Sequence, residues 1–240
     1  TTSNDSSKSG QQFGDNIYQE GTIIKGCNFT NLDSLQFVKL VDKTGFDVES
    51  YISGPIVIID GGIEKTVDVV YELESSTGLK ASVITATRGF ETRPPDLNTF
   101  YINYLNTETA GNSQFGAGES LKINKRIYEG ATERTDLEEL NIASINVTLQ
   151  TNHVGNSFGI QSAAGVIFQK GHFLFANAQT VIVSKYTNQP NGVSVGFEVK
   201  EQLISALQDS ALYDNANGST NQNAPGADRL KLSPTLVVKS

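Results

Sequence analysis

The most constraining feature of this chain is a residue pattern with a period of two. In Lys65–Glu74, every second residue from Val67 to Leu73 is apolar, and the residues between them are polar except Val70. Successive side chains of a β-strand point to opposite faces, so this pattern predicts a strand with one buried face. The turn sequence Ser75–Gly78 leads into a second β-branched run, and the two runs together predict a β-hairpin.

Similar runs recur along most of the chain and predict an all-β fold of the β-sandwich or barrel-like kind. The Asn191-Gly192 step favours a hairpin between the last two runs, and Asp60-Gly61-Gly62 predicts a turn. Helix is expected in only two short pieces, a single turn at Thr135–Glu138 with capping-box spacing and a segment at Glu201–Gln208. The other strands are expected at Gln36–Val41, Pro55–Ile59, Thr99–Leu105, Ser120–Ile127, Ile142–Leu149, Val181–Tyr186 and Val193–Val199.

Composition narrows the classes of partner. The net charge is −8 and the 18 basic residues are scattered singly, which disfavours nucleic acid because phosphate neutralisation needs clustered Lys and Arg. No apolar stretch approaches the ~18 residues that span a bilayer, so no membrane partner is expected. Cys27 is the single cysteine, so an internal disulfide is impossible, and its apolar neighbours predict a small buried residue.

An internal repeat predicts how the chain is organised. Residues 17–30 (IYQEGTIIKGCNFT) align without gaps with residues 167–180 (IFQKGHFLFANAQT), and both copies share a central glycine, Gly21 or Gly171. We expect two equivalent hairpins that turn near these glycines and share one sheet or core. The expected division is a flexible polar arm at 1–12, a main β-domain at 13–35 plus 106–240 built from the two hairpin halves, and an inserted barrel-like β-subdomain at 36–105 whose ends lie close together.

No motif in the chain predicts catalysis, a cofactor or a metal ion. Gly116-Ala117-Gly118 lacks the lysine and third glycine of a phosphate loop, and Asp214–Gly218 lacks the third ligand and the closing glutamate of a calcium loop. His153 and His172 have no converging ligands at metal-site spacing. Two carboxylate pairs fit the solvent face of an ordinary strand or turn better than a hydrolase cleft: Glu72 with Glu74, and Glu138 with Glu139. We therefore expect a protein that is not an enzyme.

The polar segment Asp209–Asp228 is too long for an ordinary turn, which predicts an ordered contact surface. Leu212 and Tyr213 offer an apolar anchor for a partner's pocket. The alternative is that these two side chains pack within their own domain. The candidate partner contacts are Leu212, Tyr213, Asp214, Asn217 and Arg229.

Three stretches resemble a known family: Gly14–Thr30, Gly165–Glu201 and Asp209–Leu236. They are similar to an uncharacterised domain family in virion structural proteins of tailed bacteriophages, notably contractile-tailed phages of cyanobacteria. The block Asp214–Lys231 is the most specific part, whereas residues 36–105 match loosely, through Phe100–Thr107. Family members usually begin with a helical segment before this region, so the polar arm seen here is expected to reflect truncation or processing.

The resemblance implies a structural protein of the virion tail, and it carries no catalytic residues. The expected function is a scaffold in the tail baseplate or tail-fibre attachment network, with other virion tail proteins as partners and a homo-oligomer, such as a trimer, as its assembled form. The alternative is a receptor- or carbohydrate-binding tail-fibre module, which needs exposed aromatic side chains on a concave face. Phe100, Tyr101 and Tyr104 are candidates for that role, although their strand context favours core packing.

Overall fold

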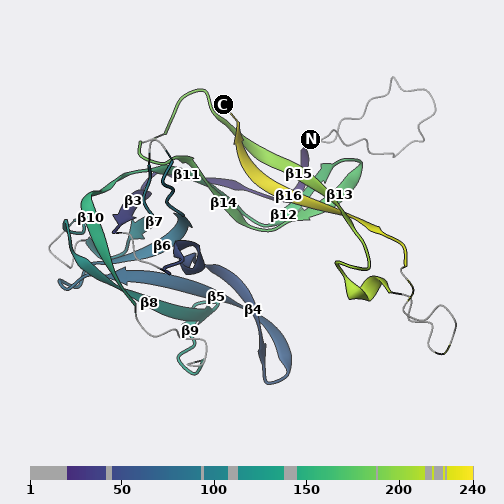
Figure 1. Ribbon diagram of the computed structural model, residues 1–240, viewed down its shortest axis with the longest axis horizontal. Helices are drawn as coiled ribbons and strands as arrows, with labels where there is room; N and C mark the ends of the chain where they lie inside the picture. Colours follow the sequence, from purple (N-terminus) through teal and green to yellow (C-terminus); the bar gives the residue numbers. More distant parts are fainter. Residues whose placement is uncertain are drawn as a thin grey trace. The chain divides into compact units, whose positions relative to one another are not determined.

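The regular structure of the chain is nearly all β-strand, which confirms the all-β prediction (Figure 1). The structure is a computed structural model, and it describes residues 21–41, 45–92, 95–107, 113–137, 145–187, 189–213, 218, 224 and 226–239. The predicted arm at 1–12 lies outside the described residues, and so does Glu138 of the predicted helical turn.

The chain divides into two compact units, which we call the barrel unit and the open unit. The barrel unit comprises 31–159 and 182–191, and the open unit comprises 1–30, 160–181 and 192–240. The predicted insertion at 36–105 falls wholly within the barrel unit, but that unit continues well beyond Leu105. The boundary differs from the one expected because strands after residue 105 pair with strands before it, which a local pattern cannot show.

Six antiparallel strands of the barrel unit form a closed ring. Going round the ring they are β5 (Ile63–Glu74), β6 (Lys80–Thr87), β7 (Thr99–Tyr104), β3 (Gln36–Leu40), β10 (Ile145–Asn156) and β8 (Ser120–Glu129), and β8 pairs back onto β5. Two further strands extend the sheet beyond the ring, β4 (Gly54–Asp60) beside the first half of β5 and the short β9 (Thr132–Glu133) beside β8. Closure of this kind removes strand edges and encloses a core.

The core of the barrel unit follows from the period-two pattern. The alternating apolar residues of β5, from Val67 to Leu73, are all buried. Glu72 between them is buried as well, so it does not lie on an open solvent face as expected, because it accepts a hydrogen bond from Arg126 Nε at 2.8 Å. Gln36 lies opposite Ile102 in the ladder between β3 and β7, so the two ends of the predicted insertion lie on adjacent strands. The ring interior is filled by buried side chains, including Val38, Leu40, Val69, Leu73, Val83, Phe100, Ile102, Leu121, Ile123 and Leu149.

The open unit contains a three-stranded sheet and a two-stranded ribbon. In the sheet, β12 (Gly165–Gln169) lies between β1 (Thr22–Gly26) and β13 (His172–Ala176). In the ribbon, β15 (Ser194–Ile204) pairs along its whole length with β16 (Arg229–Lys239). The chain passes between the units at four places: within β2 (Phe29–Leu32), β11 (Phe158–Ser162) and β14 (Gln179–Ser184), and between residues 191 and 192. The three strands pair in the order β14-β11-β2.

The predicted repeat places two equivalent strands in one sheet. β1 and β13 occupy equivalent positions of the repeat, and both pair antiparallel with β12. Gly171, with a φ of 74°, forms the turn between β12 and β13 as expected. The first strand of the hairpin expected at Gly21 falls in residues 17–20, which lie outside the described residues.

Two local predictions were wrong. β14 and β15 do not form a hairpin across Asn191-Gly192, because β14 pairs with β11 and β15 pairs with β16. Glu201–Gln208 is not a helix, because β15 continues to Ile204 and every residue of it has a partner in β16. In both places pairing with a strand distant in sequence overrides a local preference.

Candidate interaction surfaces

The predicted contact segment is anchored in its own unit at Leu212. This side chain is 5% exposed, and it lies in a short 3-10 turn (Ser210–Leu212) whose cap, Asp209, accepts a hydrogen bond from the Ala211 N–H at 2.9 Å. The Gly226 N–H donates to the Leu212 carbonyl oxygen at 3.0 Å, and a Cβ at Gly226 would lie 2.3 Å from that oxygen. Leu212 therefore follows the alternative interpretation, in which it packs locally.

The other four candidate contacts are only partly brought together. Tyr213 is half-buried next to Leu212, whereas Arg229 is exposed. Arg229 is the first residue of β16 and lies opposite Ile204, the last residue of β15. Asp214 and Asn217 lie outside the described residues. Their role in partner contact remains a prediction.

An apolar surface lies at the end of the ribbon, beside Arg229. Leu203 and Leu230 are directly opposite each other on β15 and β16 and are 60% and 57% exposed, and Leu207, just after β15, is 90% exposed. We call Leu203, Leu207 and Leu230 the ribbon end. Because a helix was predicted at Glu201–Gln208, this pairing was not expected from the sequence. It depends on the register between two strands some 25 residues apart, and no local pattern specifies that register.

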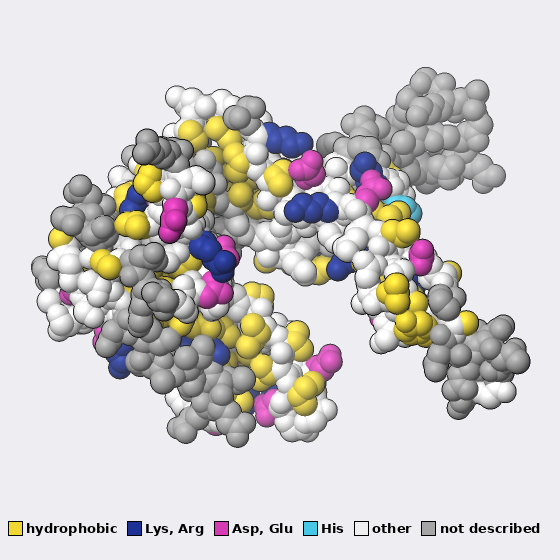
Figure 2. All heavy atoms as spheres, in the orientation of Figure 1, with side chains coloured by type: hydrophobic (Ala, Val, Ile, Leu, Met, Phe, Trp, Pro, Cys, Tyr) yellow, Lys and Arg dark blue, Asp and Glu magenta, His cyan; other side chains and the backbone are white. Residues whose placement is uncertain are grey.

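A second apolar surface lies on the hairpin of β4 and β5 in the barrel unit, where Figure 2 shows hydrophobic side chains at the surface. Gly61 and Gly62 form the two-residue turn that the sequence predicts, and both have positive φ, as a type I′ turn requires. Val57, Ile59 and Ile63 are each about two-thirds exposed. Among the described residues β4 pairs with β5 alone, so it is an edge strand.

Ion pairs hold the turn of this hairpin in place. Asp60 Oδ2 lies 3.1 Å from Lys65 Nζ and 2.9 Å from Arg134 Nη2, and Arg134 also pairs with Glu129 and Asp136. The hydrogen bond from Arg134 lowers the pKa of Asp60 and lowers that of Asp136 to about 2. These exposed pairs contribute little energy individually, but together they connect the β4–β5 turn to the β8–β9 turn.

A buried carboxylate organises the loop between β6 and β7. Asp96 Oδ1 lies 3.2 Å from Lys39 Nζ, its Oδ2 lies 3.3 Å from Lys185 Nζ, and the Tyr186 hydroxyl donates to the same carboxylate. Burial raises the pKa of Asp96, but the hydrogen bonds from Tyr186 and Lys39 outweigh it and leave that pKa below its ordinary value. Lys39, Lys185 and Tyr186 all contact this carboxylate, and Lys39 Nζ also lies 3.9 Å from the centroid of the Tyr186 ring. The cluster therefore holds the loop in place.

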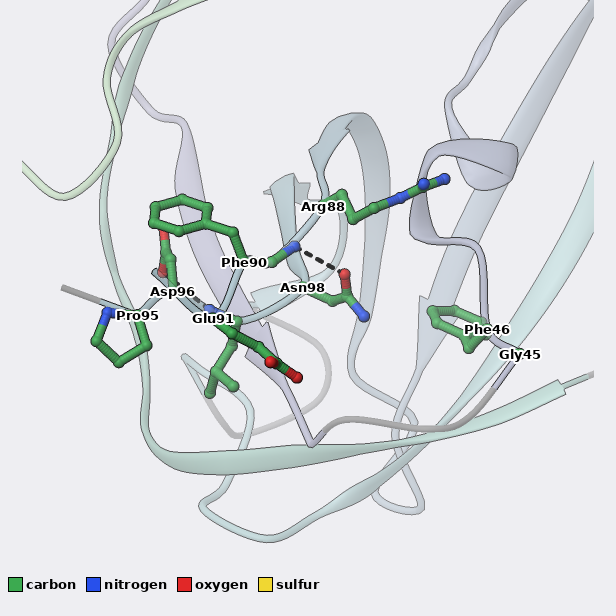
Figure 3. Close-up of a pocket in the computed structure, with 10 residues that line it drawn as sticks. Gly45, Phe46, Arg88, Phe90, Glu91, Pro95, Asp96 and Asn98 are labelled. Carbon is green, nitrogen blue, oxygen red and sulfur yellow. Dashed lines mark hydrogen bonds between the residues drawn. The ribbon is translucent and has the colours of Figure 1, made fainter. Parts of the chain in front are cut away.

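The same loop borders a pocket of about 560 Å³ (Figure 3). Arg88, at its rim, engages Asp47 at 2.8 Å, and the Gly89 N–H donates to Asn98 Oδ1 at 2.9 Å. A Cβ at Gly89 would lie 2.7 Å from the Asp96 carbonyl oxygen, so the two sides of the loop are in close contact. Arg88 and Asn98 at this pocket are thus engaged by other groups of the protein itself. The lining residues are Gly45, Phe46, Arg88, Gly89, Phe90, Glu91, Pro95, Asp96, Leu97 and Asn98.

The aromatic residues considered for a carbohydrate platform belong to the core. Phe100 and Tyr101 are fully buried, and Tyr104 is half-buried with its hydroxyl oxygen accepting a hydrogen bond from the Phe115 N–H at 3.0 Å. Burial raises the pKa of Tyr104 to about 12. These three side chains therefore follow the core-packing interpretation.

The described residues offer neither a metal site nor a membrane-spanning helix. Within them no three or more His, Cys, Asp or Glu side chains gather as metal ligands, and no helix is long and apolar enough to cross a bilayer. His172 is exposed, and Cys27 is buried, as expected, with its pKa raised by that burial.

Comparison of the chain with protein-family models, with curated proteins and with solved structures finds no match in any of the three. Any role proposed for the two apolar surfaces therefore rests on their own geometry and composition.

Proposed function

We propose that this chain is a structural subunit of a phage virion tail that joins its neighbours through protein–protein contacts in the baseplate or the tail-fibre attachment network. The proposal is supported by the resemblance of the three stretches described above, of which Asp214–Lys231 is the most specific. The single observation that supports the contact role is the exposure of the three leucine side chains of the ribbon end.

The ribbon end is suited to contact because it is incomplete by itself. The ribbon packs on the core of the open unit at Phe197, but none of the residues 202–204 and 229–231 at its other end is buried. A two-stranded segment without another element packed on it is marginally stable in water. Burying a leucine side chain completely contributes about 1.5–3 kcal/mol, and Leu203 and Leu230 are more than half exposed and directly opposite each other. A partner that covers this pair therefore stabilises both the ribbon and the assembly, with exposed Arg229 as a polar contact beside it.

Two experiments test the proposal. Gold-labelled antibody against the chain should mark the tail of virions of the phage that encodes it. The double variant Leu203→Ser/Leu230→Ser should keep its melting temperature but fall at least about tenfold in purified tails, because the lost apolar contact exceeds the ~1.4 kcal/mol that a factor of ten represents. The matched control is Val41→Ser/Ile52→Ser, which changes two exposed aliphatic residues of the barrel unit.

Three results would count against the proposal. Virions without label would contradict the assignment to the particle. Equal incorporation of the double variant, the control and the wild type would exclude the ribbon end as the contact. Specific binding on a glycan array would instead favour the receptor- or carbohydrate-binding module.

A further inference from the structure

We propose that two copies of this chain pair through β4, edge to edge and antiparallel, across a two-fold axis at Ile58. The role of this pairing in the particle rests on the proposed function. The pairing adds to that function one named partner, a second copy of the same chain. It uses the barrel unit, whereas the contact proposed above uses the ribbon end.

The backbone of β4 has hydrogen-bonding groups directed away from β5. In an antiparallel ladder, opposite residues alternate between hydrogen-bonded and non-bonded pairs. The two-residue turn makes Asp60 and Ile63 a bonded pair, so the pairs that begin at Ile58 and Ile56 are bonded as well. Pro55, Val57 and Ile59 therefore direct their backbone groups outward.

Pro55 limits the registers that a second copy can use. It has no N–H, and it occupies an outward position, where a proline is tolerated in an edge strand. A two-fold axis at Ile58 places Val57 opposite Ile59 of the second copy and uses the outward N–H and carbonyl groups of these two residues in each chain. The neighbouring in-phase register, centred on Val57, would place Ile59 opposite Pro55 and lose a donor in each copy.

The side chains at this edge are complementary to themselves. Val57 and Ile59 lie on the same face of β4 and are 66% and 68% exposed. In the proposed register these side chains form two identical cross-strand pairs, Val57 with Ile59 of the second copy and the reverse. Because a two-fold axis repeats each pair, both pairs join exposed β-branched apolar side chains, which suit opposite positions of an antiparallel ladder.

The charges also permit self-association, although the chain carries a net charge of −8. No charged residue occurs from Pro55 to Ile59. Asp60 ends the strand, but it is paired with Lys65 and Arg134 and would lie opposite Ile56 of the second copy. Edge strands are commonly protected by charged side chains, proline or bulges. β4 has Pro55 near its start, but Val57–Ile59 has none of these three features.

Sedimentation equilibrium of the whole chain tests the proposal directly. The wild type should show a monomer–dimer equilibrium, and Val57→Lys or Ile59→Glu alone should each raise the dissociation constant by about tenfold or more. The double variant Val57→Lys/Ile59→Glu should return to within about threefold of the wild type, because the introduced lysine of each copy then lies opposite the introduced glutamate of the other. Ile63→Ser is the matched control, since Ile63 is 65% exposed but lies on β5 with its backbone paired to Asp60.

Each other outcome overturns the pairing. A chain that remains monomeric at all concentrations excludes a second copy as the occupant, and β4 is then free for a different protein. An oligomer that is insensitive to both single variants has its interface elsewhere. Single variants that dissociate without recovery in the double variant exclude this register. Because the ribbon end is unchanged in all these chains, incorporation into tails reports on the proposed function separately.

Discussion

The two units of this chain bury the apolar faces of their strands to different degrees. In the barrel unit a closed ring surrounds a core that includes Leu73, Phe100 and Leu121, each fully buried. In the open unit the sheet and ribbon keep their edges, and their core is small: Cys27, Ile167 and Ala176, with Leu174 and Phe197 packed against them. The comparison indicates that the barrel unit is stable by itself, whereas the open unit has side chains available for a partner.

β4 is the exception within the barrel unit. It lies outside the closed ring, and its apolar residues from Ile56 to Ile59 leave an edge that closure has not removed. Both units therefore have exposed apolar side chains, and we expect the units to differ in how much of their stability depends on covering these side chains. The following predictions test that difference, from the largest expected effect to the smallest.

The largest effect is expected in the barrel core. Leu73→Ala or Leu121→Ala should lower the free energy of unfolding by about 2–5 kcal/mol, because each removes a fully buried side chain from a closed core. Urea denaturation followed by circular dichroism measures the change, with exposed Ile63→Ala as the control, expected within about 0.5 kcal/mol of the wild type. If the core variants matched this control, the ring would not be the stable part of the molecule.

A smaller loss is expected at Leu212 in the open unit. Leu212→Ala should cost about 2 kcal/mol, the lower end of the range for a buried leucine, because Leu212 lies in a short turn outside both clusters of buried residues. The loss should appear as a lower unfolding midpoint of the open unit, with the barrel transition unchanged. A variant with unchanged stability that fails to join its virion partners would restore Leu212 as a partner anchor.

The Asp96 cluster should have an intermediate effect confined to the barrel unit. Asp96→Asn keeps the size of the side chain but leaves Lys39 and Lys185 without their common carboxylate. We expect a loss of about 1 kcal/mol in the free energy of unfolding, the lower end of the range for an unpaired buried group, because Lys185 is 40% exposed and can be solvated. Because the folded pKa of Asp96 is below its ordinary value, its contribution is present above pH ~4 and is lost as the pH falls through the folded pKa. A wild-type unfolding curve without this acid dependence would contradict the cluster.

The smallest effect concerns the ion pairs at the β4–β5 turn. The carboxyl group of Asp136 should titrate with a pKa of about 2 in the wild type and return toward about 4 in Arg134→Gln, because Arg134 is the main cause of the shift. Carboxyl carbon chemical shifts followed by NMR between pH 1.5 and 6 measure both values, a range chosen to bracket ~2 and ~4. Equal pKa values in the two chains would show that the guanidinium does not hold this carboxylate.

Local patterns in the sequence predicted faces and turns but not distant partners. Three features could be predicted because each depends on neighbouring residues: the alternation in β5, the hairpin into β6 and the Asp60–Gly62 turn. The closure of β8 onto β5, which pairs Leu73 with Ile123, depends on packing between strands about fifty residues apart. For the same reason the pairing of Leu203 with Leu230 was missed, and the local burial of Leu212 was predicted only as the alternative to a partner contact.

Hydrogen exchange measured by mass spectrometry, on the whole chain alone and in assembled tails, tests the central contrast most directly. Amides of β5 and β7 should exchange slowly in both states, because opening them requires disruption of the closed ring. Amides of β15 and β16 near Leu203 and Leu230 should exchange quickly in the isolated chain and slowly in the tail. Ribbon amides as well protected as those of the barrel in the isolated chain would contradict the account, because the open unit would then need no partner.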